Sequence, residues 1–444
     1  MMALLESQED YLAPAPEWSP QSTRSFTRGN SVHDEVIRYA AFVRNLNVES
    51  ISARAYRISD GSRAVSFWGH IPDTTSLVAR LISNSKDITK GILRGAGLSV
   101  PDGSVFERDQ EDEAWAFART IGLPVVVKPT HGYGGRGVTS NIEERRHFAL
   151  AWKVAQDFAS TQIIVERHIH GRDFRLFVVG DQLRAAIWRV PAYIEGDGET
   201  SIEGLIERKN QSRRPNPYVG AKPIRLTPVM LRHLEDQGLR PDSIPSLGRR
   251  VSLHLVANIG GGGESVDVTE DVHPDFADIA VRTCKALPGA IHCGVDLLVE
   301  DIAHPASRQT WAICEINTNP DIAMHHFPVA GRPRDAAGAL IEHLFPGSRP
   351  VDMRLWERVH IEVAGPVDGV GFGRWLRRAA RLRGLTGWVR SGAEDRVEAV
   401  LCGPSRTVEN VVSLCRIGPD RTEPREVAVS EYRGRIPPRF AIRT

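Results

Sequence analysis

The sequence predicts an α+β protein of several domains, and three observations carry this prediction. The chain has 444 residues, which leaves room for about three units of roughly 150 residues each. Apolar residues at helical spacing alternate along the chain with short runs of strand character. The last part of the chain has the order strand, helix, strand, strand, helix, strand, which is typical of a ferredoxin-like βαββαβ unit.

The composition excludes several classes of protein. Lys and Arg number 56 and Asp and Glu 55, so the formal net charge is +1. Charged residues are 25% and hydrophobic residues 41% of the chain, a globular mixture that excludes a wholly disordered, collagen-like or coiled-coil protein. A nearly neutral chain has no overall field that would attract nucleic acid or an anionic membrane, and we expect neither partner.

The cysteines and the apolar runs predict a cytoplasmic protein. None of the five cysteines belongs to a Cys-x-x-Cys pair, so we expect no disulfide framework and no structural zinc site. The first 20 residues show no signal-peptide pattern. The apolar runs are too short to span a bilayer.

Residues 1–30 and 31–83 predict a leader and a small N-terminal domain. The first 30 residues are rich in Pro, Ser, Glu and Arg without a period, which indicates a flexible leader. In the domain that follows, we expect a helix at 32–42, strands at 51–58 and 64–68, and a helix at 76–85.

Residues 84–346 predict a larger domain of mixed elements. Gly97 and Gly122 stop two of its helices, and Thr227 with Pro228 begins another. The expected helices are 86–96, 111–121, 143–158, 227–238, 274–287 and 336–344, and residues 196–210 are expected to form a turn followed by a helix. The expected strands are 125–128, 163–166, 173–179, 185–190, 251–258, 293–299 and 312–317.

Residues 347–355 predict a linker, and residues 356–444 predict the βαββαβ unit. The linker lacks periodicity and carries Gly and Pro. The elements of the unit are strands at 359–363, 387–391, 397–402 and 427–431, with helices at 372–383 and 406–415.

The stretch 132-GYGGRG-137 indicates phosphate binding. It matches the dinucleotide fingerprint, but that fingerprint must open a helix, and the residues after Gly137 have strand character. A strand–loop–strand instead presents backbone N–H groups to a phosphate chain, and Lys128 before the loop supplies a positive charge. A surface hairpin with a solvated lysine is the alternative.

Three oxygen-bearing residues lie in apolar strand contexts near residue 300. They are Asp296, Glu315 and Asn317, and the last two point to the same face of one strand. Buried carboxylates are usually paired or metal-bound, and these donors suit Mg²⁺. Structural carboxylates bonded to turns or arginines are the alternative.

Several separate motifs, taken in order, resemble the ATP-grasp superfamily. The resemblance is closer to the ATP-grasp domains of cyanophycin synthetases and bifunctional glutathione synthetases, and covers about residues 76–346. It implies two α+β subdomains in the larger domain. The motifs include 84-NSKDITKGILRGAGLSVPDG-103, 123-LPVVVKPTHGYGGRGVTSNI-142, 164-IVERHIHGRDFRLFVVG-180, 257-ANIGGGGESVDVTEDVHPD-275, 294-GVDLLVED-301 and 313-ICEINTNPDIAMHHFPVAGRPR-334.

The resemblance implies a role for each matching residue. Lys86 and Lys128 match the lysines that bind the nucleotide phosphates, beneath the loop glycines Gly134, Gly135 and Gly137. Glu166 and Ile169 match the residues that bind adenine, and Asp173 matches the residue that binds the ribose. Asp296, Glu315 and Asn317 match the ligands of Mg²⁺ or Mn²⁺. Arg175 and Arg189 match arginines near the transferred phosphate or the acceptor, and a rim salt bridge is the alternative for both.

The family's reaction is ATP-dependent amide formation. A carboxylate takes the γ-phosphate to give an acyl phosphate and ADP, and an amine then displaces phosphate. The resemblance thus implies a carboxylate–amine ligase that uses ATP and acts on amino acids or peptides; a homo-oligomer remains possible. One departure is Asp321, which replaces the family's Gly and leaves the acceptor open. We expect His325 and His326 to be loop residues at a rim.

The last domain resembles acylphosphatases. The matching stretches are 365-GPVDGVGFGRW-375 and 386-TGWVRSG-392. Gly373 and Ser391 stand where that family has its arginine and asparagine, and Arg374 lies one residue late, so we expect the fold without hydrolysis. Two alternatives to a ligase remain: a nucleotide-binding scaffold without turnover, and an acyl-phosphate hydrolase.

Overall fold

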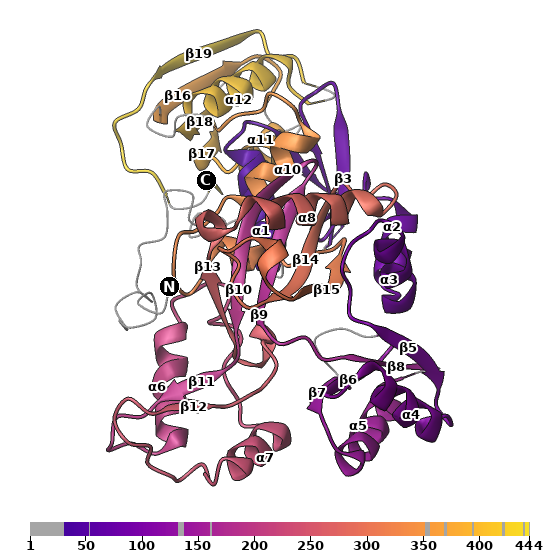
Figure 1. Ribbon diagram of the computed structural model, residues 1–444. Coiled ribbons are helices and arrows are strands. Elements are labelled where there is room, and N and C mark those ends of the chain that lie inside the picture. The colour runs from indigo at the N-terminus through magenta and orange to yellow at the C-terminus, as the bar shows by residue number, and fades with distance from the viewer. Residues whose placement is uncertain are drawn as a thin grey trace. The chain divides into compact units, whose positions relative to one another are not determined.

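The computed structural model describes residues 31–52, 54–131, 137–159, 162–350, 356–367, 371–392, 395–419, 422–437 and 440–443. Its contacts divide the chain into two compact units (Figure 1). The described part of unit 1 is residues 74–339; unit 2 combines residues 31–73 with those from 340 onward. The expected leader and part of the expected linker, residues 351–355, lie outside the described residues.

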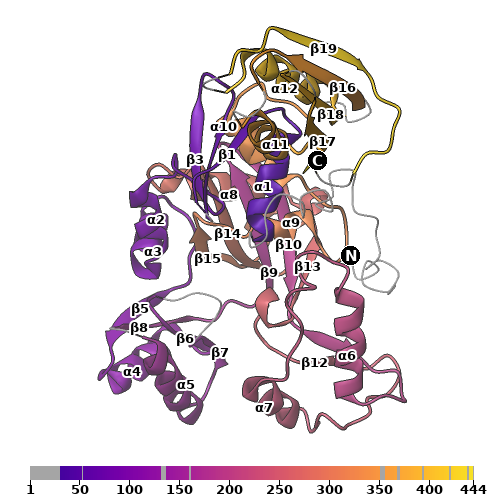
Figure 2. The ribbon, with the colours of Figure 1, turned by 180° about the vertical axis from the view of Figure 1, so that it is seen from behind.

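A five-stranded antiparallel sheet forms the centre of unit 1. The strand order is β13 (Glu264–Asp267), β10 (Gln182–Val190), β9 (Arg172–Val179), β14 (His292–Val299) and β15 (Trp311–Asn317). Helix α8 (Pro274–Ala286) lies along β9, β10 and β14 on one face (Figures 1 and 2). Because side chains alternate along a strand, the residues between the apolar ones point to the opposite face.

The face toward α8 is the main core of unit 1. Phe174 and Leu176 of β9 are fully buried there, together with Phe276 and Ile279 of α8. Helices α2 (Leu77–Ser83) and α3 (Lys86–Gly95) add Ala79 and Leu93 to the same cluster. Arg175, between Phe174 and Leu176, therefore lies on the other face, which is polar.

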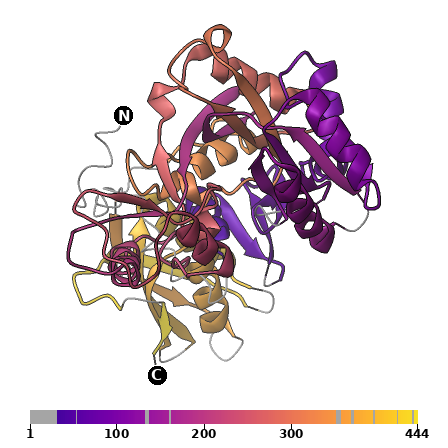
Figure 3. The same ribbon diagram turned by 60° about the horizontal axis from the view of Figure 1, so that its bottom comes forward.

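Two lobes extend from the central sheet as separate groups of elements (Figures 1 and 3). The first lobe is a four-stranded sheet in the order β5, β8, β6, β7, with two helices over a core that contains Phe148 and Trp152. Its elements are β5 (Gly103–Glu107), α4 (Glu111–Ile121), β6 (Val125–Pro129), β7 (Thr139–Ile142), α5 (Arg145–Phe158) and β8 (Gln162–Arg167).

The second lobe pairs β11 (Tyr193–Glu195) with β12 (Arg250–Ser252) beside α6 (Ile202–Arg213) and α7 (Pro228–Asp236). The expected strand at 251–258 is wrong beyond residue 252. The chain instead reaches a short 3-10 turn, Ile259–Gly261, where the Asn258 side chain accepts from the N–H of Gly260 at 2.8 Å. A side chain that caps a turn competes with strand pairing. Unit 1 continues with α9 (Ala323–His326) and α10 (Ala336–Leu344), which runs into unit 2.

The C-terminal part of unit 2 has the predicted βαββαβ order. Its elements are β16 (Trp356–Ala364), α11 (Phe372–Leu382), β17 (Thr386–Ser391), β18 (Arg396–Pro404), α12 (Ser405–Ile417) and β19 (Glu426–Glu431), with β20 (Ala441–Ile442) added. The sheet order is β19, β16, β18, β17, β20. Both helices bury apolar side chains against it, among them Leu376 and Val411.

The N-terminal segment of unit 2 is α1 (Val32–Phe42) with a four-stranded sheet. The strands are β1 (Asn47–Ser50), β2 (Ala55–Ser59), β3 (Ala64–Trp68) and β4 (Ile71–Pro72); β1 and β4 were not predicted. The Asn45 side chain accepts hydrogen bonds from Thr407 at 3.3 Å and Asn410 at 3.2 Å, both on α12. This segment thus packs within unit 2, whereas the domain boundaries drawn from the sequence remain a prediction.

No helix among the described residues is long and apolar enough to cross a membrane. All five cysteines are free, and four of them are buried.

Replacing Phe276 by Ala tests the α8 core. The ring is fully buried and meets Trp311 edge-on at 6.0 Å, so its loss leaves a cavity. We expect the free energy of unfolding of unit 1 to fall by about 3–5 kcal/mol. Hydrogen exchange of α8 and β14 measures this. Leu247→Ala, at a side chain that is 82% exposed, is the control and should change little. Equal exchange in the two variants would contradict the assigned core.

Candidate functional site

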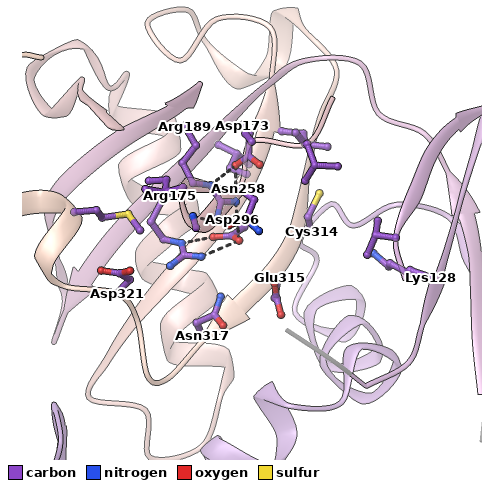
Figure 4. Close-up of a pocket in the computed structure, with 18 of the residues that line it drawn as sticks. Lys128, Asp173, Arg175, Arg189, Asn258, Asp296, Cys314, Glu315, Asn317 and Asp321 are labelled. Atoms are coloured by element: carbon purple, nitrogen blue, oxygen red, sulfur yellow. Dashed lines mark hydrogen bonds and ion pairs between the residues drawn. The ribbon is translucent and has the colours of Figure 1, made fainter. Parts of the chain in front are cut away.

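A pocket of about 440 Å³ opens on the polar face of the central sheet (Figure 4). Strands of the sheet, β6 of the first lobe, and the segments around residues 220, 258 and 321 line it. The polar side chains in its lining are Lys86, Lys128, Asp173, Arg175, Arg189, Tyr218, Lys222, Asn258, Asp296, Cys314, Glu315, Asn317 and Asp321.

Strand register brings the central group together. Asp296 of β14 lies opposite Arg175 of β9 on one side and opposite Glu315 of β15 on the other. Directly opposed residues of antiparallel strands share a face, and Asn317, two residues after Glu315, shares it too. Residues more than 100 positions apart therefore meet.

Asp296 is held by two arginines. Its carboxylate accepts from Nε and Nη2 of Arg175, the latter at 3.0 Å, and from Nη2 of Arg189 at 2.8 Å. Burial alone would raise the pKa of Asp296, but the two guanidinium groups outweigh it and hold that pKa below its ordinary value. Asp296 is thus a buried ionised carboxylate.

Asp173 extends this network. Arg189 donates to Asp173 through Nε at 2.8 Å and Nη2 at 2.6 Å. Burial raises the pKa of Asp173, and the guanidinium of Arg189 offsets this only in part. Arg175 and Arg189 thus form ion pairs, but at the base of the pocket and not at its rim. Arg175 is only 7% exposed.

Glu315 and Asn317 fit a divalent cation. Glu315 is partly open to the pocket, with Nζ of Lys86 at 3.8 Å. The side-chain nitrogen of Asn317 is buried without a hydrogen-bond partner in the described part of the chain, but an N–H donor does not bind a cation, so the fit rests on the amide oxygen and on Glu315. Carboxylate and amide oxygens suit Mg²⁺. Asp296 fits less simply, because arginines occupy both of its oxygens.

Glu166 binds lysines in this structure. Its carboxylate accepts from Nζ of Lys128 and from Nζ of Lys90, and all three side chains are buried. Burial lowers the pKa of both lysines. Neither Glu166 nor Ile169 is among the residues that line the pocket, and their assignment to adenine stays a prediction.

The loop glycines are only partly described. Gly134 and Gly135 lie outside the described residues. Gly137 has a φ of +71°, and a Cβ there would lie 3.1 Å from the Phe158 ring and 3.2 Å from Pro129. Both features favour glycine at the end of the loop.

The sequence analysis missed Lys90, Lys222, Tyr218 and Asn258. The rarity of lysine could have pointed to Lys90 and Lys222, because the chain has only seven lysines. Lys90 also follows Lys86 by one helical turn. Tyr218 and Lys222 come from an aperiodic loop and reach Asp321 only through the fold.

Cysteine and histidine side chains also lie at or near the pocket, and Cys314 is among its lining residues. Burial raises the pKa of the Cys314 thiol to about 11, which leaves it protonated at neutral pH. His325 and His326 are 0% and 1% exposed in α9, so the rim position expected for them is wrong. The His326 ring accepts from the N–H of Ala337 at 2.9 Å, and the His325 ring lies 5.4 Å from that of Phe177.

Two family models match the chain. Residues 85–191 match the ATP-binding domain of the carbamoyl-phosphate synthase L chain, and residues 359–442 match acylphosphatase. The first contains Lys86, Lys128, Asp173 and Arg189 of the pocket.

Known proteins resemble the larger region. The bifunctional glutathione biosynthesis protein GshAB of Pasteurella multocida is 34% identical over 63% of this chain and 37% of its own length. The cyanophycin synthetase of Crocosphaera subtropica is 33% identical over 70% of this chain and 36% of its own. The crystal structure of the bifunctional glutathione synthetase from Pasteurella multocida superposes with a TM-score of 0.54 at 30% identity, covering 72% of this chain and 44% of that one. The chain thus spans less than half of the length of each of these relatives.

His325 predicts an acid-sensitive fold. Burial, with Arg175 nearby, lowers its pKa to about 3. Below pH 6.5 the His325 imidazole is protonated in the unfolded chain but stays neutral in the folded protein. The free energy of unfolding therefore decreases as pH falls from about 6.5 toward 3, by roughly 1.4 kcal/mol per pH unit. Asp321 and His326 also act on this ring. In the His325→Phe variant, this pH-dependent loss of stability should be absent.

Denaturant unfolding at several pH values measures the effect. His304→Phe, which replaces an exposed imidazole, is the control and should keep the wild-type slope. A His325→Phe slope equal to that of the wild type would contradict the assignment.

Proposed function

We propose that the protein is an ADP-forming carboxylate–amine ligase. The chain carries an ATP-grasp ligase domain that is homologous to those of bifunctional glutathione synthetases and cyanophycin synthetases. It also carries a C-terminal acylphosphatase domain. The observation that supports this most is the charge order of one pocket. Lys128 lies at one end, and Glu315 and Asn317 lie between it and Asp321 (Figure 4). Lys86 also lines the pocket, with Nζ 3.8 Å from Glu315.

The lysines act on the nucleotide. We assign Lys86 and Lys128 to its phosphates, since both line the pocket and compact ammonium groups bind phosphate as point charges. Lys128 must then exchange its bond to Glu166 for one to phosphate. Asp173 is assigned to the ribose, and Gly137 to the phosphates.

Glu315 and Asn317, with Asp296 once an arginine releases one of its oxygens, would hold Mg²⁺ or Mn²⁺. The cation would neutralise the repulsion between two anions that react. Arg175 and Arg189 are fixed by Asp296 and Asp173, so their guanidinium groups are pre-positioned to orient the donor carboxylate or the transferred phosphoryl group.

The reaction has two balanced steps. A donor carboxylate oxygen attacks the γ-phosphorus, the bond to the β-phosphate oxygen breaks, and ADP leaves. The amine nitrogen, once its ammonium form has lost a proton, attacks the acyl carbon, the carbon–oxygen bond to phosphate breaks, and phosphate leaves as the amide forms. Of the two protons that the ammonium loses, one goes to the phosphate and one to solvent. Amino acids or peptides are the substrates that we propose. No cysteine nucleophile is needed, which agrees with the protonated Cys314 thiol.

Glu315→Gln tests the ligase. Hydroxylamine traps acyl phosphates as hydroxamates, so purified protein with Mg-ATP, hydroxylamine and a panel of N-acetyl amino acids and peptides reports the first step. We expect ADP and hydroxamate formation to fall roughly 100-fold or more, because the carboxylate that would hold the cation beside the reacting phosphate loses its charge. Glu300→Gln, at an exposed carboxylate after β14, is the control.

Three outcomes separate the alternatives. Hydroxamate that depends on Glu315 supports the ligase. Nucleotide binding without ADP in the wild type would favour a scaffold. Equal rates in the Glu315→Gln and wild-type proteins would remove Glu315 from the site.

The C-terminal domain is proposed to be non-hydrolytic. Gly373 is the second residue of α11, Arg374 follows about 100° around the helix and is exposed, and Ser391 ends β17. A Cβ at Gly373 would meet Val389 at 3.7 Å, an ordinary contact, so a side chain can begin there without a clash.

The full chain should therefore hydrolyse benzoyl phosphate at the background rate. The double variant Gly373→Arg with Ser391→Asn should hydrolyse it measurably, because it supplies the guanidinium and amide that acylphosphatases use. Phosphate release measures both. Turnover by the wild type would instead support the hydrolase alternative.

A further inference from the structure

The end of the pocket away from the phosphate lysines has its own charged group. Figure 4 shows Lys128 and Asp321 at opposite ends, with Glu315 and Asn317 between them. Asp321, Lys222 and Tyr218 all line the pocket, and no role in the proposed reaction is assigned to them above.

The three side chains form a compact contact. The buried Tyr218 hydroxyl donates to Oδ2 of Asp321, and Nζ of Lys222 lies 3.7 Å from the same oxygen. The Lys222 ammonium also lies 3.4 Å from the centre of the Tyr218 ring. The Asp321 and Lys222 side chains keep 26% and 29% exposure, so a ligand in the pocket can reach both charges.

Asn216 and the buried Arg213 hold this group in place. The Asn216 side chain accepts from the N–H of Tyr218 at 2.9 Å and donates to the carbonyl of Phe327 at 3.1 Å, which ties the loop to the segment after Asp321. Arg213, 1% exposed, donates to the carbonyls of Lys222 at 3.2 Å and Gly262 at 3.0 Å. A surface ion pair has no such framework.

The charges decide what this end can bind. A carboxylate repels phosphate and a donor carboxylate, so Asp321 favours a cation. Lys222 places a positive charge beside it, with Nζ 3.7 Å from Oδ2 of Asp321. An α-amino acid carries an ammonium and a carboxylate on one carbon atom, and thus presents the complementary pair at a similar spacing.

We propose that Asp321 and Lys222 form the acceptor subsite of the ligase and select a free zwitterionic α-amino acid, Asp321 binding its ammonium and Lys222 its carboxylate. Tyr218 orients Asp321, and Arg213 positions the backbone that carries Lys222. This inference rests on the proposed function and specifies the amine substrate, which that proposal left open.

Binding measurements test the subsite without turnover. The probes are the twenty common amino acids, titrated singly by calorimetry into full-length protein with Mg²⁺ and a non-hydrolysable ATP analogue. The methyl ester and the N-acetyl derivative of the tightest binder follow, since they remove the carboxylate charge and the ammonium in turn.

Two variants separate the two contacts. Asp321→Asn keeps an oxygen for the Tyr218 hydroxyl, and we expect amino-acid affinity to fall about tenfold or more. Lys222→Met should weaken the free amino acid similarly while binding the methyl ester as the wild type does. Nucleotide affinity and melting temperature should be unchanged. Asp242→Asn, which removes an exposed carboxylate of unit 1 that does not line the pocket, is the matched control.

The failures are distinguishable. If no amino acid binds the wild type, or if Asp321→Asn binds as the wild type does, the subsite assignment is overturned, whatever the hydroxamate assay shows. If a peptide or the methyl ester binds the wild type as tightly as the free amino acid, the role of Lys222 is overturned. If hydroxamate never forms although nucleotide binds, the proposed function fails first.

Discussion

The pairing of Asp296 with Arg175 and Arg189 is the interaction on which the polar face of the central sheet depends. A carboxylate and two guanidinium groups this far from water are costly singly, and each is tolerated because the others neutralise it. The pairing also fixes three neighbouring strands at one register, since Asp296 faces Arg175 directly. Glu315 and Asn317 take their positions in the pocket from the same register.

Strongly patterned elements were predictable from the sequence. The helix at 111–121 and the strand at 173–179 match α4 and β9 closely, because their apolar spacing also decides which face is buried. The strand expected at 251–258 failed because Asn258 caps a turn, a local hydrogen bond that the apolar letters before it conceal. The rim position predicted for the two histidines of α9 was wrong, because the polarity of histidine does not reveal that one ring packs on Phe177.

Site residues that belong to sequence motifs were predictable. Contacts between residues far apart in the sequence were not. Lys86, Lys128, Asp173, Asp296, Glu315 and Asn317 all line one pocket, as the motif order suggested. The contact between Tyr218 and Asp321 joins residues 103 positions apart and involves an aperiodic loop. The carboxylate of Glu166 is bonded to two lysines here, and its assignment to adenine, made from its position in a motif, stays a prediction.

The contact of Asn45 with α12 has a consequence for how the protein can be divided. Residues near both ends of the described chain make one unit, so residues 74–339 are an insertion in the sequence of that unit. The chain passes between the units near residue 73 and again near residue 340. A single cleavage therefore frees neither unit. Removing the C-terminal domain alone would also strip α1 and its sheet of the helix that Asn45 contacts.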